Sequence, residues 1–330
     1  MHEKLFHQES LSGKTFLVTG GAGFIGSNLV EYLLKHGASK VRVIDNLLTG
    51  NKENIRQFHN HPDFEFMEAD IRDKESCRKA CAGMQYVSHQ AALGSVPRSV
   101  KDPLTTHEIN STGFLNMLVA AREEKVKRLV YASSSSVYGD HSQLPKKEED
   151  TGNPLSPYAV TKKTNELYAS VFSATYQMEI IGLRYFNVFG PNQSPEGPYA
   201  AVIPLFIENI MNNQHATIDG DGEQTRDFTY VDNAIQANIK GLLTSNREAL
   251  NKVYNVAVGE RISINQLFES IAALAGSNAK PVYRESRAGD IRDSIADISR
   301  SKKLLGYEPT IRFKSGLELT LNWFMQNLKR

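Results

Sequence analysis

The feature that most restricts the fold is a run of glycines directly after the first apolar segment. The stretch KTFLVTGGAGFIGSNLVEYLLKHG predicts a buried strand, a turn through Gly20, Gly21, Gly23 and Gly26, and an amphipathic helix that ends at Gly37. Glycines at these spacings allow a tight turn, close approach of the backbone to a pyrophosphate, and close packing of helix on strand. Phosphates would then bind the free N–H groups at the helix N-terminus. The loop therefore predicts a dinucleotide-binding unit rather than a purely structural turn.

An acidic residue follows at the end of the second predicted strand, VRVIDN. Asp45 comes 19 residues after Gly26. A carboxylate at this place can accept both hydroxyls of an adenosine ribose, and it repels a 2′-phosphate. Lys52 in the following loop is a cation, which would instead favour a 2′-phosphate and hence NADP. On balance, the pair of features predicts NAD, rather than NADP, as the cofactor.

Strands and helices alternate through the first half of the chain. FEFMEADI, YVSHQAA, RLVYASSSSVYG and EIIGLRYFNVFG continue the strands, with helices predicted in DKESCRKACAG and at about residues 110–125. Alternation at this spacing predicts the α/β class, with a doubly wound parallel (Rossmann) sheet covered by helices on both faces.

After Gly190 the pattern changes, and PNQSPEGPYA predicts a loop over a binding cleft. A helix in AVIPLFIENIMNN, a strand in ATIDGDGE, a helix at about 231–243, a strand in VYNVAVG and a terminal helix in GLELTLNWFMQNLKR follow. We expect residues 1–186, joined by 223–257, to form an NAD-binding domain. Residues 187–222 and 258–330 should form a smaller, interleaved substrate lobe.

The composition excludes several classes of function. The 330 residues carry 38 basic and 37 acidic side chains, a net charge of +1, which offers no broad attraction for nucleic acid or an anionic membrane. The polar start MHEKLFHQES lacks the apolar core of a secretory signal, and no segment reaches the ~20 apolar residues of a membrane span. Cys77 and Cys81 lie one helical turn apart without further ligands, so we expect ordinary thiols, no metal site and a cytoplasmic protein.

A candidate acid–base group lies in SPYAVTKKTNELYA, where Tyr158 and Lys162 are four residues apart and share one helix face. A nearby ammonium, together with an oxidised nicotinamide ring, should favour the phenolate and lower the tyrosine pKa. The pattern Y-x-x-x-K is common on helix surfaces. Here, however, the fifth strand ends in the serines 133–136, and strand ends of such a sheet point into the ligand crevice. Those serines could instead simply cap and turn the chain.

Taken together, TGGAGFIG, SSSSVYG and YAVTK resemble an extended short-chain dehydrogenase/reductase, from about Lys14 to the C-terminus. Within that family the chain most resembles the nucleotide-sugar 4-epimerases, particularly those acting on UDP-N-acetylglucosamine. The stretches that carry this resemblance are HQAALGSVPRS, NPLSPYAVTK, LRYFNVFGP, GDGEQTRDFTYVDN and RAGDIRDSIAD.

The resemblance assigns roles to individual residues. It implies catalysis by Tyr158, which takes the proton of the sugar 4-hydroxyl, Lys162, which holds the nicotinamide ribose, and the hydroxyls of Ser134, Ser135 and Ser136. It implies cofactor contacts from Gly20, Gly23, Phe24, Ile25, Gly26, Asp45, Asn46, Gly50, Asp70, Ile71, Gln90, Ala91, Tyr158 and Lys162. It implies substrate contacts from Gly94, Ser95, Ser134, Asn187, Arg226, Arg287, Asp290 and Ser294.

Two local features narrow the expected reaction. Relatives that dehydrate or decarboxylate sugars carry an acidic residue beside the active serine or threonine, whereas here the neighbours are Ser135 and Ser136. Ser294 resembles the position that limits space at the sugar C2 substituent, and with Gly94 and Ser95 it leaves room for an N-acetyl group. The favoured reaction is interconversion of UDP-GlcNAc and UDP-GalNAc through a transient 4-keto sugar.

Other functions stay open at this point. The corresponding uronic acids, or UDP-glucose and UDP-galactose, are alternative substrates of a 4-epimerase. A net NAD-dependent nucleotide-sugar oxidoreductase belongs to a different class, and a non-catalytic sensor is disfavoured by the Ser134, Tyr158 and Lys162 set. The resemblance also implies a homodimer that pairs through helices near 110–125 and 158–176, and a place in polysaccharide biosynthesis.

Overall fold

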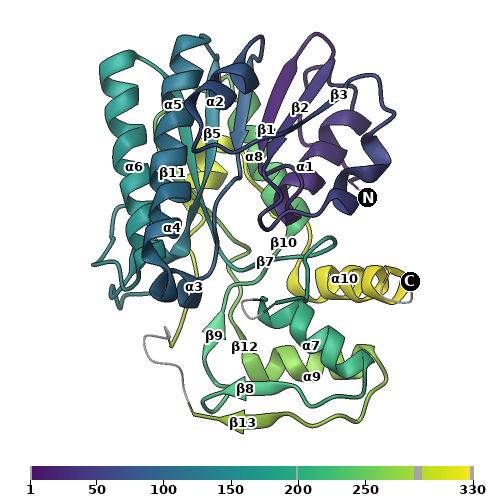
Figure 1. Ribbon diagram of the computed structural model, residues 1–330. Helices are drawn as coiled ribbons and strands as arrows, with labels where there is room; N and C mark the ends of the chain where they lie inside the picture. Colours follow the sequence, from purple (N-terminus) through teal and green to yellow (C-terminus); the bar gives the residue numbers. More distant parts are fainter. Residues whose placement is uncertain (1, 198–199, 286–291, 328–330) are drawn as a thin grey trace.

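Seven parallel strands form one sheet, and its carboxyl edge gathers the segments singled out above. The computed structural model describes residues 2–197, 200–285 and 292–327 (Figure 1). The strand order is β11-β6-β5-β4-β1-β2-β3. These strands are β1 (Thr15–Thr19), β2 (Lys40–Asp45), β3 (Phe64–Glu68), β4 (Tyr86–His89), β5 (Arg128–Ser134), β6 (Glu179–Tyr185) and β11 (Val253–Val256). They coincide with the seven strands expected from the apolar runs in these regions, and the predicted doubly wound sheet is confirmed.

Helices cover both faces of the sheet (Figure 1). One face carries α2 (Lys74–Cys81), α5 (Gly113–Glu123) and α6 (Pro157–Tyr176), and the other carries α1 (Phe24–Lys35) and α8 (Val231–Leu243). Because successive side chains of a strand point to opposite faces, Leu17 joins the core under α2 and α5 while Val18 joins the core under α1 and α8. Burial of each such side chain contributes roughly 1.5–3 kcal/mol. Continuous apolar strands are therefore the expected signature of this sheet.

The segment between β4 and α5 differs from the prediction. Two short helices, α3 (Val96–Lys101) and α4 (Pro103–His107), precede a π-helical turn, η2 (Glu108–Thr112). The side chains of Ser95 and Asp102 cap α3 and α4, and a proline follows each cap in the first turn. Such short elements carry too little periodicity to be recognised from sequence, so only the helix beyond residue 110 was expected.

The other elements lie largely beyond the carboxyl edge of the sheet, where α7, α9, β8 and β13 gather at one end of the molecule (Figure 1). The paired strands there are β8 (Thr217–Asp219) with β13 (Val282–Arg284), β9 (Thr225–Arg226) with β12 (Ile262–Ser263), and β7 (Val188–Phe189) with β10 (Thr229–Tyr230). The helices there are α7 (Val202–Met211), α9 (Ile264–Leu274) and α10 (Phe313–Asn327). Short helical turns complete the chain: η1 (Lys52–Phe58), η3 (Ser135–Tyr138), η4 (Arg247–Ala249) and η5 (Ser301–Leu305).

Throughout the described ranges, the helices are too short or too polar to serve as membrane spans.

Candidate active site

A cavity of about 640 Å³ runs along the carboxyl ends of the strands and brings most of the predicted residues together. Its wall includes every predicted cofactor residue except Asp70, which lies just behind it. Of the predicted catalytic residues, Tyr158, Lys162, Ser134 and Ser135 line the cavity and Ser136 does not. One continuous space therefore joins the glycine loop to the tyrosine and the serines.

The glycine loop is packed so closely that side chains cannot replace its glycines. A Cβ on Gly26 would lie 2.1 Å from the carbonyl oxygen of Gly20, and one on Gly20 would lie 2.7 Å from the backbone nitrogen of Ala91. Gly20 also has a φ of 68°, which favours glycine. Helix α1 begins after Gly23 with no side-chain cap and no acidic residue in its first turn. Its N-terminus is thus suited to an anionic diphosphate.

The glycine loop and the N-terminus of α1 form one end of the cofactor-binding part of the cavity, called here the cofactor seat. Asp45 lies at the other end of this seat, where an adenosine ribose is expected. One oxygen of its carboxylate accepts from the Ala22 N–H at 3.0 Å, and the other accepts from the Leu47 N–H at 2.8 Å. A Cβ on Gly50 would lie 2.9 Å from both oxygens, so the loop after β2 folds directly over the carboxylate. Each oxygen has a second lone pair, and burial raises the pKa of Asp45 above its usual value. The arrangement fits NAD.

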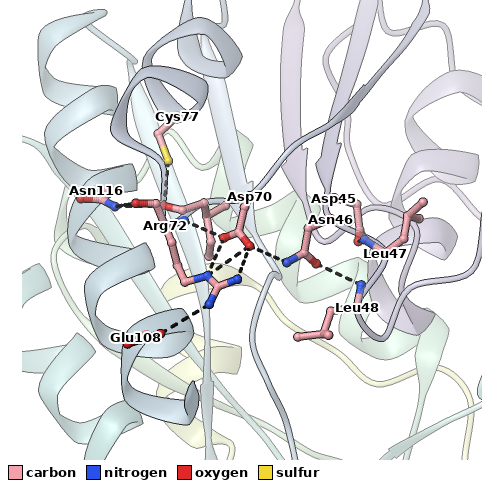
Figure 2. Close-up of polar contacts among 10 residues, drawn as sticks. Asp45, Asn46, Leu47, Leu48, Asp70, Arg72, Cys77, Glu108 and Asn116 are labelled. Carbon is pink, nitrogen blue, oxygen red and sulfur yellow. Dashed lines mark hydrogen bonds and ion pairs between the residues drawn. The ribbon is translucent and has the colours of Figure 1, made fainter. Parts of the chain in front are cut away.

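Asp70 stands behind this end of the cavity in a dense set of polar contacts (Figure 2). Its carboxylate binds the Arg72 guanidinium at 2.7 Å and accepts from the Asn46 amide at 2.8 Å. Asn46 in turn accepts from the Leu48 N–H at 3.1 Å. Partial burial raises the pKa of Asp70, but the bonds from Arg72 and Asn46 outweigh it and hold the pKa at about 2. Asp70 thereby anchors the loop that covers Asp45.

The turn after β3 is fixed from two helices (Figure 2). The Asn116 amide of α5 donates to the carbonyls of Ile71 and Arg72, at 3.0 and 2.9 Å. The Cys77 thiol of α2 donates to the Ile71 carbonyl at 3.1 Å, and burial raises its pKa to about 12. Cys77 and Cys81 are both buried and free, and the first of them helps to position a wall residue of the cavity.

Tyr158, Ser134 and Lys162 meet at the other end of the cavity. Tyr158 lies in the first turn of α6, which Ser156 caps and Pro157 begins. Its phenol is hydrogen-bonded to the hydroxyl of Ser134, at the end of β5. The Lys162 ammonium lies 5.8 Å from the centre of the Tyr158 ring and donates to the Ala132 carbonyl at 2.8 Å. A phenol, a hydroxyl and a buried cation thus surround one point of the cavity.

The pKa of Tyr158 differs from the expectation. Burial raises it above the usual value, and the bond with Ser134 opposes this effect only in part. Lys162 does not lower it, because the ammonium is directed to Ala132, and burial lowers the pKa of Lys162 itself to about 8. The spacing of Tyr158 and Lys162 indicates a nearby cation, but the desolvation of both groups depends on the tertiary structure. The positive charge of an oxidised nicotinamide ring would counteract the rise in the Tyr158 pKa that desolvation causes.

The serines around Ser134 have separate tasks. Ser133 also lines the cavity, and its hydroxyl donates to the Glu166 carboxylate at 2.6 Å. The backbone N–H of Ser136 donates to the Ser134 hydroxyl at 3.1 Å, which helps to orient that hydroxyl toward Tyr158. Ser135 lines the cavity. No carboxylate occurs beside Ser134 along residues 133–136.

The structure separates the predicted substrate residues into three groups. Gly94, Ser95 and Asn187 line the cavity. Arg226 and Ser294 do not line it. The Arg226 guanidinium donates to the Thr225 carbonyl at 2.9 Å, and the backbone N–H of the buried Ser294 donates to the same carbonyl at 3.1 Å. Arg226 lies in β9 and Ser294 follows Asp293, which bridges to Thr225, so the two residues lie together outside the cavity lining. Arg287 and Asp290 lie outside the described residues.

Several wall residues were not predicted. Arg98, half-buried on α3, and Tyr185, the last residue of β6, both line the cavity. Both lie in stretches already noted, SVPRS and YFN. Their nearness in sequence to Ser95 and Asn187 is the signal that could have predicted them as wall residues. Gln193 and Glu196, in the loop before α7, also reach the wall, in agreement with the cleft loop expected there.

That loop is tied directly to the cofactor seat through Asn28 of α1. The Asn28 amide donates to the Phe24 carbonyl at 2.9 Å and to the Pro191 carbonyl at 3.0 Å. Its side-chain oxygen contacts Nε2 of the buried His2 at 3.1 Å. The first turn of α1, the start of the loop and the N-terminal segment therefore meet at a single buried side chain.

Known proteins resemble the chain over nearly its whole length. The model of a family described as the NAD dependent epimerase/dehydratase family matches residues 16–257. A putative UDP-glucose 4-epimerase of Methanocaldococcus jannaschii is 39% identical over 94% of this chain and 98% of its own. A UDP-N-acetylglucosamine 4-epimerase of Methanobrevibacter ruminantium, solved with UDP-N-acetylmuramic acid, is 40% identical with a TM-score of 0.89, covering 95% of this chain and 98% of that one. A UDP-glucuronic acid 4-epimerase of Bacillus cereus, solved with UDP-glucuronic acid and NAD, is 33% identical with a TM-score of 0.88, covering 94% and 99%.

The chain belongs to the NAD-dependent epimerase/dehydratase family, with the extended short-chain dehydrogenase/reductase fold. It is an NAD-dependent nucleotide-sugar 4-epimerase. The predicted fold class, cofactor and enzyme class are thereby confirmed.

Proposed function

We propose that this enzyme interconverts UDP-GlcNAc and UDP-GalNAc. The observation that carries the proposal is the open space at Gly94 in a cavity that also holds Tyr158. A methyl group built on Gly94 would meet no other heavy atom within 4 Å. With Ser95 beside it, this part of the wall leaves room for a substituent as large as an N-acetyl group. The similarity to the Methanobrevibacter enzyme supports the same substrates.

The chain's own residues supply the proton transfer. Tyr158 removes the proton of the sugar 4-hydroxyl and later returns it, while Ser134 holds the same oxygen and stabilises the charge that develops on it. Lys162 binds the nicotinamide ribose, and the positive charge of the oxidised nicotinamide ring favours the Tyr158 phenolate. NAD held by the glycine loop and Asp45 would supply reversible hydride transfer at the sugar C4, so that no net oxidation results. Asn187, and the arginines 226 and 287 with Asp290, recognise the UDP part in this proposal.

A second candidate substrate is the uronic acid of the same sugars. Within the described part of the cavity wall the cationic side chains are Arg98 and Lys162, and Lys162 is directed to a backbone carbonyl. In this candidate function, the Arg98 guanidinium pairs with the C6 carboxylate. The similarity to the Bacillus cereus enzyme supports this candidate.

One assay separates the candidates. The purified protein is incubated, without added NAD, with UDP-GlcNAc, UDP-glucose and the matching uronic acids, and products and reduced cofactor are followed. Conversion of UDP-GlcNAc to UDP-GalNAc at the highest kcat/KM, without stoichiometric NADH, supports the proposal. Preference for a uronic acid that Arg98→Gln abolishes favours the second candidate. Stoichiometric NADH would contradict epimerisation altogether.

We also propose a homodimer that pairs through α6. Large apolar side chains at helical spacing, Val160, Leu167, Tyr168 and Val171, are 37 to 60% exposed along this helix. Residues spaced in this way form one stripe, and such a stripe on a soluble protein usually marks an interface. Sedimentation of the wild type and of Leu167→Glu tests this. A dimer that the charge converts to monomer is expected, and a monomeric wild type would contradict the proposal.

A further inference from the structure

A closed ring of buried hydrogen bonds lies behind the cavity wall, between β4, β6 and α8. The Tyr185 hydroxyl donates to Oε1 of Gln90 at 3.0 Å and accepts from Nδ2 of Asn238 at 2.7 Å. Nε2 of Gln90 donates to the Ser88 hydroxyl at 2.8 Å and to Oδ1 of Asn238 at 2.9 Å. Ser88 donates to the same Oδ1 at 3.0 Å, and Asn238 also donates to the Ala234 carbonyl at 2.8 Å.

Every donor proton of these four side chains has an acceptor. The Ala234 carbonyl fixes the orientation of the Asn238 amide, and the amide of Asn238 then fixes the orientation of Gln90. The Tyr185 proton is committed to Gln90, so this second phenol in the cavity keeps its proton while Tyr158 exchanges one. Burial raises the pKa of Tyr185 to about 12, which also keeps it neutral. A fully satisfied buried network of this kind holds its members in one arrangement.

The ring touches both functional ends of the cavity. Tyr185 pairs in register with Ser134 on the neighbouring strand, and Ser134 is bonded to Tyr158. At the other side, the backbone of Gln90 would lie 3.0 Å from a Cβ on Gly20, so it packs against the glycine loop. Gln90 and Tyr185 themselves line the cavity.

We propose that Gln90 and Asn238 are positioning residues, which hold the Tyr185 ring as a fixed wall for the nicotinamide half of NAD while the keto sugar turns over. The inference rests on NAD-dependent 4-epimerisation and not on the identity of the sugar. Oxidation of the C4 alcohol breaks the C4–H bond, with hydride transfer to the cofactor, and the O–H bond, with proton transfer to Tyr158, and both must return to the same carbon and oxygen. If the Tyr185 ring shifts, hydride and proton do not return to the sugar. Equal amounts of reduced cofactor and 4-keto sugar then remain on the enzyme.

The variants Gln90→Leu and Tyr185→Phe test this, with the best of the UDP-sugar substrates that the wild type converts. After substrate is added, the near-ultraviolet absorbance of reduced nicotinamide gives the fraction of enzyme stalled between the two hydride transfers. We expect this fraction to rise on the order of tenfold in each variant, with kcat falling to match. Because both changes break the same ring, the double variant should be no worse than the more severe single one.

Tyr254→Phe is the matched control. It removes a buried phenolic hydroxyl, which donates to the Ala249 carbonyl at 2.7 Å, and neither residue lines the cavity. An unchanged reduced fraction in Gln90→Leu and Tyr185→Phe overturns the proposal, as does an equal rise in Tyr254→Phe. If Gln90→Leu does not fold, Tyr185→Phe decides by the same measurement, since it removes a single hydroxyl. A wild type that converts no UDP-sugar would instead refute the proposed function.

Discussion

The sheet half of the molecule and the smaller elements beyond its carboxyl edge are held together by different means. The cofactor seat is formed by backbone, since the loop through Gly20 and Gly26 leaves no room for side chains. The region of β8, β9, β12 and β13 instead uses strands of two or three residues joined by ion pairs. Asp221 with Arg292, at 2.8 Å, and Asp293 with Arg261, at 2.7 Å, are examples. Exposed pairs of this kind contribute little to stability.

The difference indicates which half can change. A seat formed by backbone is coupled to the packing of the entire sheet, so substitutions there should abolish NAD binding and stability together. The part of the cavity wall at Gly94, Ser95 and Asn187 lies in loops, so it can be altered one group at a time, with effects limited to substrate affinity. Each of the following variants tests one side of this contrast.

Tyr158→Phe should have the largest effect on catalysis. Loss of a general acid–base group lowers kcat by on the order of 10³-fold. The phenyl ring keeps its place in the first turn of α6, so the protein should retain NAD and unfold at the wild-type temperature. Product formation and thermal unfolding measure the two quantities. Tyr176→Phe, at the far end of the same helix, is the control, and substantial turnover by Tyr158→Phe would refute the assigned base.

Gly26→Ala and Gly94→Ala place the same methyl group on the two sides of the cavity. At Gly26 the methyl carbon would lie 2.1 Å from the Gly20 carbonyl oxygen, whereas at Gly94 it meets nothing within 4 Å. Overpacking costs about 1–3 kcal/mol or more, so Gly26→Ala should lose bound NAD and stability. Gly94→Ala should keep both and raise KM for N-acetylated sugars. Bound NAD and urea unfolding provide the comparison, and equal behaviour of the two variants would contradict it.

Asp227→Asn tests the junction between the halves. The buried carboxylate of Asp227 accepts from the N–H groups of Val258 and Gly259 at 3.0 Å and of Ala296 at 3.3 Å. Burial raises its pKa from 3.8 to about 6, so the folded state binds this proton more tightly than the unfolded state. The associated stability, about 3 kcal/mol for two pKa units, is present below pH 3.8 and lost as the pH rises through 6. Urea unfolding across this range should show the decline in the wild type and not in the variant, and parallel curves would contradict the assignment.

Asn187→Gly should have the smallest effect. Asn187 lines the cavity with a φ of 30°, and glycine removes the amide while it keeps this backbone conformation accessible. Loss of one hydrogen bond to a charged diphosphate corresponds to about 1.5 kcal/mol, or roughly a tenfold rise in KM. NAD content should not change. If the variant instead lost its cofactor, the proposed division between the two ends of the cavity would be wrong.

The sequence predicted the fold and the cofactor end well because both depend on local patterns. Apolar runs defined the seven strands, and the spacing of glycines before a helix, with Asp45 after the next strand, indicated the seat. The sequence said less where position depends on distant pairing. The bridge between residues 225 and 293 brings Arg226 and Ser294 together from distant parts of the chain, and neither of them lines the cavity, so their contact with substrate stays a prediction.

Two electrostatic features also lay beyond the sequence. The spacing of Tyr158 and Lys162 put them on one helix face, but it could not show that the ammonium turns to the Ala132 carbonyl. Gln90 was expected at the cofactor, yet its partner Asn238 is 148 residues away in the chain. Desolvation and long-range hydrogen bonds depend on the completed tertiary structure.

The bridge from Asn28 to Pro191 has a consequence for how this enzyme exchanges molecules with its surroundings. A wide opening of the loop at residues 190–197 must break a hydrogen bond that braces the first turn of the phosphate-binding helix. Motion of that loop and of the first turn of α1 is therefore coupled through Asn28. We expect the dwell time of NAD to exceed that of the sugar by many turnovers. The cofactor would then act as a permanent part of the catalyst, and its rate of escape would report how rarely the loop opens fully.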